Sequence, residues 1–398
     1  MNDYALILNA GSSSLKFCVF QRPETEDWHL ESRGQIEGIG TSPRIVVRNG
    51  EEKTLVDRRL DGAVHDARDA LNVLAAWLKS TYGGAQLVGV GHRVVHGGAQ
   101  FTSPIVVTQQ ILAELRRLVP LAPLHQPYNL AAIEAIFERL PHVPQVACFD
   151  TSFHRGQPAV AELIPLPHEI CRGGVQRYGF HGLSYEYIAS SLPLVAPEIA
   201  RGRVIVAHLG SGASLCALKN GKSFDCSFGF TALDGICMAT RPGSVDPGVV
   251  LHLFQTLGLS AKEVETILYK KSGLLGISGI SSDTRELLRS GDPRARLALD
   301  YFVYRITKEI GAMCAALGGI DGLVFTAGIG ENSIEIRHRI CESSAWLGIE
   351  LDTEANSRNG PRISTRGSKI SVWVIPTNEE LMIARHTALL LGLIEARV

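Results

Sequence analysis

The sequence predicts an α/β protein built from two lobes, each with a mixed β-sheet, and two observations carry this prediction. Strand-like and helix-like segments alternate along the 398 residues, a length that suits two domains better than one. The opening stretch ALILNAGSSSLKFCVF at 5–20 also has a counterpart, VIVAHLGSGASLCAL at 204–218, about half a chain length later. Both stretches read as two apolar strands joined by a Gly/Ser turn. We therefore expect a duplicated α/β unit with a cleft between the copies.

The individual elements follow from hydrophobic periodicity. Residues 65–78 place apolar side chains at helical spacing and predict an amphipathic helix. The segment 172–185 is rich in glycine and aromatic residues and is expected to form a loop. The other expected elements are strands at 4–10, 15–20, 86–95, 145–150, 322–328 and 369–376 and helices at 129–140 and 294–317.

The composition excludes several classes of function. Hydrophobic residues make up 45% and charged residues 20% of the chain, and the net charge of −1 offers no basic excess for nucleic acid or an anionic membrane. No apolar run approaches the roughly 18 residues of a membrane helix, and the N-terminus lacks the basic region of a signal peptide. The eight cysteines show no CxxC spacing, so we expect reduced core residues in a cytoplasmic protein.

Three Gly-rich turns are candidate phosphate sites. Successive backbone N–H groups in such a turn can converge on an anion, and the missing side chains let phosphate oxygens approach. The turn at 9–16 adds serine hydroxyls and Lys16, the turn at 208–212 reads HLGSG, and the third segment, AGIGEN at 327–332, is a Gly-rich junction between a strand and a helix. Each of the two turns alone is equally consistent with a plain chain reversal, and AGIGEN alone is weak evidence of a nucleotide site. None matches the P-loop pattern or the full GxGxxG spacing, but their combination in one chain favours nucleotide binding.

Three charged residues lie in apolar or Gly-rich surroundings. Asp150 ends a strand-like run, the place where α/β proteins present reactive groups, although an aspartate there also serves as a cap or turn former. Arg93 lies in GHRVVHGG, and Arg241 lies in MATRPGSVDPG. An arginine in such surroundings needs an anionic partner. The partner is either a structural carboxylate or a substrate phosphate, and the sequence leaves both options open.

Two further patterns have competing interpretations. His92 and His96 have the i,i+4 spacing of metal ligands, but this spacing converges only on a helix, and the surrounding valines and glycines favour a strand. In TNEEL, Thr377 and Glu380 match the capping box T-x-x-E. This assignment leaves Glu379 free to contact a metal ion.

Nine motifs together resemble the acetate kinase family. In chain order they are NAGSSSLKF, GHRVVHGG, LAPLHQP, FDTSFH, RYGFHGLSY, HLGSGAS, SGISSDTREL, FTAGIGENS and IPTNEEL, and they cover residues 4 to about 386. The resemblance implies an actin-like, sugar-kinase-like fold of two ribonuclease-H-like lobes with ATP in the active-site cleft between them, in a homodimer. The implied lobes are residues 1–150 plus 380–398 and a nucleotide-binding lobe of residues 151–379. The implied reaction is reversible transfer of a phosphoryl group between ATP and acetate, giving acetyl phosphate and ADP, with Mg²⁺ or Mn²⁺.

The resemblance also implies roles for individual residues. Asp150 matches the catalytic acid/base position, and His181 and Arg241 match residues that stabilise the transition state. Because a carboxylate substrate is already ionised at neutral pH, we expect Asp150 to orient groups more than to abstract a proton. Asn9 and Glu379 match the contacts to Mg²⁺. The residues expected at ATP are Ser12, Lys16, His208, Leu209, Gly210, Ser211, Gly212, Asp283, Thr284, Arg285, Gly328, Ile329, Gly330, Glu331 and Asn332, and those expected at the acyl substrate are Arg93, Val95, Leu124, Phe180 and Ala232.

Two residues depart from the usual pattern of the family. Ser211 stands where HLGNG has asparagine, and its shorter reach implies rearranged contacts to ATP. Ala232 stands where TPLEG has proline, and the smaller residue leaves room for a longer acyl chain such as propionate. A propionate kinase of the same family is therefore the nearest alternative. A non-kinase actin-like ATPase is the alternative from another class, although it would not need Arg93, His181 and Arg241 together.

Overall fold

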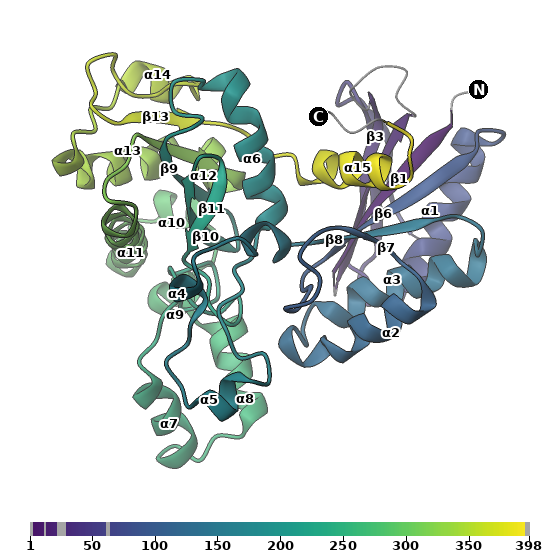
Figure 1. The fold of residues 1–398 in the computed structure, drawn as a ribbon, viewed down its shortest axis with the longest axis horizontal. Coiled ribbons are helices and arrows are strands. Elements are labelled where there is room, and N and C mark those ends of the chain that lie inside the picture. The colour runs from purple at the N-terminus through teal and green to yellow at the C-terminus, as the bar shows by residue number, and fades with distance from the viewer. Residues whose placement is uncertain (1–2, 12, 22–28, 61–63, 395–398) are drawn as a thin grey trace. The chain divides into compact units, whose positions relative to one another are not determined.

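A computed structural model describes residues 3–11, 13–21, 29–60 and 64–394, so the expected ATP contact Ser12 lies outside the described residues. The chain divides into two compact units (Figure 1). Unit 1 comprises Met1–Ser152 and Asn378–Val398, and unit 2 comprises Phe153–Thr377. Each unit is built around its own mixed sheet.

Unit 1 contains an eight-stranded sheet of order β5-β4-β3-β2-β1-β6-β8-β7. Strand β1 runs antiparallel to β2 and parallel to β6, and β6 runs parallel to β8. The carboxyl ends of β1, β6 and β8 therefore lie at one edge of the sheet. The elements are β1 (Tyr4–Ala10), β2 (Ser14–Gln21), β3 (His29–Glu37), β4 (Arg44–Asn49), β5 (Thr54–Arg59), α1 (Ala67–Tyr82), β6 (Leu87–Val94), β7 (Ile105–Val106), α2 (Gln109–Arg117), α3 (Gln126–Arg139), β8 (Gln145–Phe149) and α15 (Glu379–Leu390).

Helices pack on both faces of β6. Val90 belongs to an apolar core that it shares with α1 and α3. The alternate residues of the strand face α15, since a Cβ atom on Gly91 would lie 2.7 Å from Ile383 and closer still to Thr387. Glycine at this position therefore allows α15 to approach the sheet closely. The next residue on the same face of β6 is Arg93, which this packing places beside the N-terminus of α15.

Unit 2 contains a five-stranded sheet of order β11-β10-β9-β12-β13. Figure 1 shows α6 and α11 on opposite faces of this sheet, and the strands β9 and β10 are buried along almost their whole length. The elements are α4 (Ala159–Glu162), α5 (His168–Cys171), α6 (Gly182–Val195), β9 (Arg203–Leu209), β10 (Ala213–Lys219), β11 (Lys222–Cys226), α7 (Pro247–Gln255), α8 (Ala261–Thr266), α9 (Gly273–Ser278), α10 (Thr284–Arg289), α11 (Pro293–Leu317), β12 (Gly322–Thr326), α12 (Ala327–Asn332), α13 (Ile334–Ser343), α14 (Thr353–Ser357) and β13 (Ser371–Val374).

The sheet of unit 2 repeats the central part of the sheet of unit 1. Both sheets arrange their strands in the same spatial order relative to the order along the chain: β3-β2-β1-β6-β8 in unit 1 and β11-β10-β9-β12-β13 in unit 2. In each, the first two of these strands along the chain form an antiparallel hairpin, and the next strand pairs parallel with the first. The two sequence stretches that resemble each other form the first hairpin of each sheet. The predicted fold class, α/β with mixed sheets, is confirmed.

Two expectations about local structure are wrong. Residues 182–185 do not belong to a loop but begin α6, because His181 adopts a left-handed backbone conformation with φ 59° and starts the helix. Helix α15 is capped not by Thr377 but by Asn378, whose side chain accepts a hydrogen bond from the backbone N–H of Leu381 at 3.0 Å. The predicted capping box with Glu380 is therefore absent, and Glu380 lies in the first turn of the helix instead.

The remaining expectations about the chain can be compared directly with the structure. All eight cysteines are free, and seven of them are buried, as expected for reduced core residues. His92 lies in strand β6 and bonds Gln145, which confirms the strand interpretation of GHRVVHGG. Among the described residues, no helix is long and apolar enough to cross a membrane.

Candidate active site

In unit 1 the first hairpin presents Asn9 and Lys16 beside its turn. The two residues are directly opposite each other in the β1–β2 register, Asn9 partly buried and Lys16 exposed. Asn9 follows the Leu8–His92 pair of the β1–β6 register by one residue, so it stands at the carboxyl edge of the parallel strands. The same edge carries the charged residues of the neighbouring strands.

Arg93, Asp150 and Glu379 form an ionic cluster at this edge. Nε and Nη2 of Arg93 donate to the two carboxylate oxygens of Asp150 at 2.9 and 2.6 Å, and Nη1 lies 3.5 Å from Oε2 of Glu379. Asp150 directly follows β8, and its backbone N–H bonds the carbonyl of Val94. The Asp150 side chain is only 3% exposed, against 20% for Arg93 and 15% for Glu379. Of the two partners that the sequence allowed for Arg93, a structural carboxylate or a substrate phosphate, the structure shows the carboxylate.

The cluster holds more negative than positive charge around Glu379. Burial raises the pKa of Glu379 to about 7; Arg93 acts against this rise, and the carboxylates of Asp150 and Glu380 act with it. Burial disfavours the charged form of Arg93, but Asp150 and Glu379 raise its pKa above the ordinary value. Because two other carboxylates lie near Glu379, a further cation would stabilise its charged form.

The oxygen ligands at this edge fit Mg²⁺. Magnesium prefers carboxylate and amide oxygens and commonly binds a protein through one or two carboxylates while it retains water and phosphate ligands. Glu379 and Asn9 offer such oxygens. Among the described residues there is no group of three or more His, Cys, Asp and Glu side chains that could hold a metal ion by itself. Asn9 and Glu379 offer fewer oxygens than an octahedral Mg²⁺ needs, so a metal ion held there would keep water or phosphate ligands.

In unit 2, His181 and Arg241 lie beside the turn of the first hairpin. A Cβ atom placed on Gly212 would lie 2.5 Å from Nη2 of Arg241 and 3.3 Å from Nε2 of His181. The His181 ring stacks on His208 with centroids 4.0 Å apart, and His208 Nδ1 lies 2.8 Å from the hydroxyl of Ser184. Glycine at position 212 thus leaves a space into which a guanidinium and an imidazole both point.

Arg241 differs from Arg93 in having no carboxylate partner within the described residues. Its Nη1 donates to the carbonyl oxygen of Ala232 at 2.7 Å. Burial lowers the pKa of Arg241, with only Tyr269 acting in the other direction. A partly buried guanidinium without a carboxylate partner is a strong attractor for an anion.

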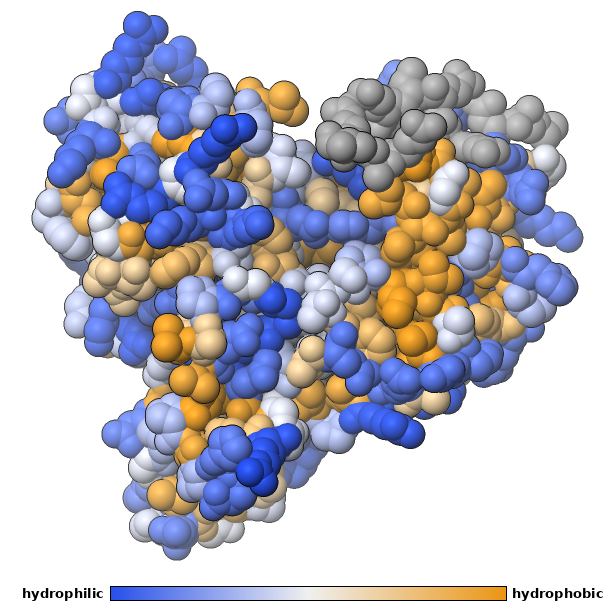
Figure 2. Space-filling view, in the orientation of Figure 1, coloured by the Kyte–Doolittle hydropathy of each residue, from blue (hydrophilic) through white to orange (hydrophobic). Residues whose placement is uncertain are grey.

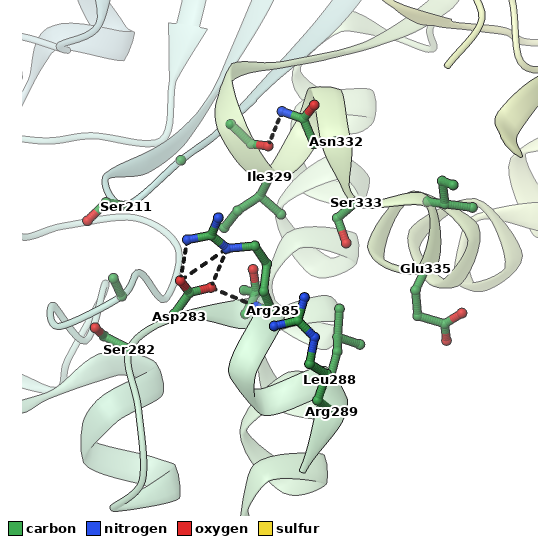
Figure 3. A pocket seen from close by; sticks show the side chains of 15 residues that line it. Ser211, Ser282, Asp283, Arg285, Leu288, Arg289, Ile329, Asn332, Ser333 and Glu335 are labelled. Atoms are coloured by element: carbon green, nitrogen blue, oxygen red, sulfur yellow. Dashed lines mark hydrogen bonds and ion pairs between the residues drawn. The ribbon is translucent and has the colours of Figure 1, made fainter. Parts of the chain in front are cut away.

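A cavity of about 690 Å³ opens next to the same turn (Figure 3). One wall is formed by Asp283 and Arg285, whose side chains form an ion pair at 2.6 Å at the start of α10. Figure 3 shows Arg285 and Ile329 on facing sides, from α10 and α12. The expected ATP residues that line the cavity are Gly210, Ser211, Asp283, Thr284, Arg285, Gly328, Ile329 and Asn332.

Other expected ATP residues lie outside the lining of this cavity. Leu209 is fully buried. The Glu331 carboxylate accepts hydrogen bonds from the backbone N–H groups of Ala327 and Thr377 at 2.8 and 3.0 Å, and the carbonyl of Gly330 accepts one from Arg337. The side chain of Glu331 thus serves to fix the chain on both sides of α12.

The expected acyl-substrate residues are spread over both units. Val95 and Leu124 are partly buried in unit 1. In unit 2, Phe180 is buried against Phe228, and Ala232 is partly buried and holds Arg241 through its carbonyl oxygen. The link between Ala232 and Arg241 was not visible in the sequence.

Sequence reasoning missed part of the cavity wall. Three of the missed residues lie in or just after the motif SGISSDTREL: Ser282 is part of it, and Leu288 and Arg289 follow it, where helical spacing from Arg285 would have found them. The full set of missed residues is Ala239, Ser282, Leu288, Arg289, Ser333, Ile334 and Glu335.

The two sheets of the same strand order, each opening with a hairpin around a small-residue turn, define an α/β protein of the actin-like ATPase fold. Residues 4–385 match the acetokinase family. The chain belongs to the acetokinase family.

The similarity extends over the whole length of the relatives. An acetate kinase of Rhodopseudomonas palustris is 52% identical over 391 residues, which cover 97% of this chain and 98% of the relative. The crystal structure of Porphyromonas gingivalis acetate kinase superposes with a TM-score of 0.87 at 37% identity, covering 98% of this chain and 100% of that one. A propionate kinase from Francisella tularensis superposes with a TM-score of 0.89 at 35% identity, covering 97% and 99%.

Proposed function

We propose that this chain is a kinase that transfers a phosphoryl group reversibly between ATP and acetate, giving ADP and acetyl phosphate. The observation that carries the proposal is the convergence of Arg241, His181 and the Gly212 turn on one space, with no carboxylate paired with Arg241 among the described residues. Membership of the acetokinase family identifies the reaction as phosphate transfer to a carboxylate.

We assign ATP binding to the cavity of unit 2. Its volume of about 690 Å³ suits a nucleotide, and its wall combines apolar side chains such as Ile329 and Leu288 with the charged Arg285 and Arg289. Its floor includes Gly210 and Ser211 of the hairpin turn, whose backbone suits phosphate oxygens. The phosphates would then approach the space that Arg241 and His181 face.

We assign the acid and the metal ion to unit 1. Arg93 has five N–H donors, and Asp150 occupies Nε and one N–H of Nη2, so donors remain for an acyl carboxylate. Asn9 and Glu379 would hold Mg²⁺, which supplies charge neutralisation on the phosphates when bound. Lys16 adds a further exposed positive charge at the same edge.

The reaction needs positioning and charge stabilisation more than acid–base chemistry. An oxygen of the ionised acetate forms a bond to the γ-phosphorus of ATP, and the bond from that phosphorus to the bridging oxygen breaks, leaving the electron pair on ADP. No proton has to be removed from acetate at neutral pH. Arg241 and His181 stabilise the charge on the oxygens of the transferring group. Asp150, held by Arg93, orients that guanidinium.

Propionate is a second candidate substrate. Alanine at position 232 is smaller than the proline that the family often carries, and one of the similar structures is a propionate kinase. We propose that acetate is the principal substrate and that propionate is also used.

We also propose that the protein is a cytoplasmic homodimer. Eight large apolar side chains of unit 2 are exposed in and around the helices α4, α5 and α7, and Figure 2 shows apolar side chains reaching the surface in this part of the unit. These residues are Val160, Leu163, Leu166, Ile170, Val249, Leu251, Phe254 and Leu257. Analytical ultracentrifugation of wild type and of Leu251→Glu tests the proposal: a dimer that the variant dissociates supports it, and a monomeric wild type contradicts it.

The reaction is tested by trapping acyl phosphate as the hydroxamate with ATP, Mg²⁺ and a series of short carboxylates. We expect product with acetate, less with longer acids, and none without Mg²⁺. ATP hydrolysis that is independent of any carboxylate, with no hydroxamate, would instead identify the non-kinase ATPase alternative.

A further inference from the structure

Two buried hydroxyl groups lie behind the His181 ring. Oγ of Ser214, on β10, lies 2.9 Å from Nδ1 of His181, and the same Oγ is hydrogen-bonded to Oη of Tyr185, on α6. Both Ser214 and Tyr185 are fully buried. Within the described part of the chain, these two groups are the only hydrogen-bond partners of the Ser214 side chain.

The two hydrogen bonds that link Tyr185, Ser214 and His181 have a preferred direction of donation. A serine hydroxyl has one hydrogen to donate, and with two partners it donates to one and accepts from the other. A tyrosine phenol, with a pKa near 10, is a better donor and a poorer acceptor than an alkyl hydroxyl. Tyr185 therefore donates to Ser214, and Ser214 donates to Nδ1 of His181. A nitrogen that accepts a hydrogen bond carries no proton, so the proton of the neutral ring is on Nε2.

Nε2 is the nitrogen that faces the candidate phosphoryl site. It lies 3.3 Å from the position of a Cβ atom on Gly212, and that position also lies next to Nη2 of Arg241. His181 caps α6 in a left-handed conformation with φ 59°, a strained backbone state that persists only where the surrounding contacts hold the residue in place.

We propose that Tyr185 and Ser214 are positioning residues that hold neutral His181 in the Nε2–H form, so that it donates a hydrogen bond to the transferring phosphoryl group without being protonated. The catalytic part of this proposal rests on the proposed function. The assignment of the proton on His181 does not.

A neutral donor suits the surroundings of His181. In the described part of the chain, the titratable and charged groups seen near it include His208 from β9, stacked at 4.0 Å, Arg241 from the segment after β11, and Tyr185 on α6. A second positive charge beside Arg241 and a stacked imidazole would be repelled. An Nε2–H donor that needs no protonation keeps its function over the whole range in which histidine normally titrates.

The assignment is tested first by NMR of full-length protein labelled with ¹⁵N in its histidines. The His181 signals are identified by their loss in His181→Gln. We expect Nε2 to carry the proton and Nδ1 to be unprotonated at pH 7.5. A protonated Nδ1 overturns the proposal, whatever the activity of the protein.

The second test compares kcat as a function of pH. In Ser214→Ala both neutral tautomers become populated, and only protonation guarantees a hydrogen on Nε2. We expect kcat to fall about tenfold at pH 8.5, because the ring loses its fixed orientation as well as its fixed tautomer, and we expect the ratio of variant kcat to wild-type kcat to rise as the pH is lowered toward 6. Tyr185→Phe leaves the Ser214 hydroxyl in place, so we expect a loss of about threefold or less. Ser214→Thr keeps the hydroxyl and should keep the wild-type pH profile.

A matched control is available in unit 1. Ser32 is also a fully buried strand residue, and its hydroxyl bonds the phenol of Tyr82 at 3.0 Å without a histidine. Ser32→Ala should lower Tm as Ser214→Ala does, because each leaves a tyrosine hydroxyl without its partner, but it should not change the pH profile. A Ser214→Ala variant with the same pH profile as wild type would reduce Ser214 to a structural residue. Absence of hydroxamate in wild type would refute the proposed function and leave the NMR result standing.

Discussion

The two sheets share one strand order but carry different chemistry at their carboxyl edges. In unit 1, strand β6 places Arg93 beside Asn9 of β1, one residue beyond the Leu8–His92 pair. Asp150 and Glu379 balance the charge of Arg93. In unit 2 the corresponding strand places Thr326 beside His208. The described residues around the hairpin there carry hydroxyl and imidazole groups, together with one arginine that donates to a backbone carbonyl.

This difference teaches that topology fixes where functional groups stand, while the local partners fix what they can bind. In the cluster of unit 1, protein carboxylates already balance the charge of the arginine. Such a cluster can bind a substrate carboxylate in place of a protein carboxylate, and its carboxylates can also bind a cation. An arginine that has no carboxylate partner among the described residues is suited to an anion that arrives with the substrate. The following predictions test this division, beginning with the largest effect.

Arg241→Ala should reduce kcat by about 100- to 1,000-fold, because it removes a positive group that acts on the transferring phosphoryl. It should change Tm little, since no carboxylate loses its partner. Arg241→Lys keeps the charge but loses the fork geometry and should recover part of the rate. Steady-state kinetics and thermal unfolding of both variants give the answer, and near-wild-type kcat in a folded Arg241→Ala would remove Arg241 from the site.

Arg93→Ala should behave in the opposite way with respect to stability. It leaves the Asp150 carboxylate, 3% exposed, without its partner, so we expect a loss of about 2–3 kcal/mol of unfolding free energy. It should also raise KM for acetate. Adding Asp150→Asn to Arg93→Ala should restore part of the stability but not KM. Equal Tm values for wild type and Arg93→Ala in a denaturation series would contradict the description of a compensated cluster.

Glu379→Gln should raise the Mg²⁺ concentration needed for half-maximal activity about tenfold, as loss of one ligand does. The change in Tm should be small, because the carboxylate already competes with Asp150 for the charge of Arg93. Glu380→Gln, one residue further along α15, is the matched control and should leave the Mg²⁺ requirement unchanged. A Mg²⁺ titration in which Glu380→Gln has the larger effect would reverse the assignment.

The smallest effect concerns Ala232. A methylene in an apolar pocket is worth about 1–3 kcal/mol, so we expect kcat/KM for propionate within about tenfold of that for acetate. Ala232→Pro should lower the propionate-to-acetate ratio. The ratio is the fair measure, because the carbonyl of this residue also holds Arg241 and a proline alters the backbone. A ratio that stays the same or rises in an active variant would place residue 232 outside the acyl pocket.

Much of the fold followed from the sequence because its strands are long and apolar. The β1–β2 and β9–β10 hairpins, the amphipathic helix α1 and the long helix α11 lie where the periodicity predicted them. Strands β3, β4 and β5 were not predicted, since they contain many charged residues and few buried ones, and β5 has no buried residue. The cap of α15 was misplaced because Thr377 already uses its backbone N–H to bond Glu331, from another part of the chain.

By itself the sequence determined the α/β class, the Gly/Ser turns and the identity of the charged residues in apolar surroundings, because these depend on local spacing and residue type. Only the tertiary structure decided the partner of each charge. Arg93 and Arg241 look alike in sequence, yet one is paired with Asp150, 57 residues away, and the other donates, among the described residues, to a backbone carbonyl. The tertiary structure likewise placed Ser214 and Tyr185 behind His181. Strand register and helix packing select hydrogen-bond partners that are far apart in the chain. The local sequence pattern determines neither the register nor the packing.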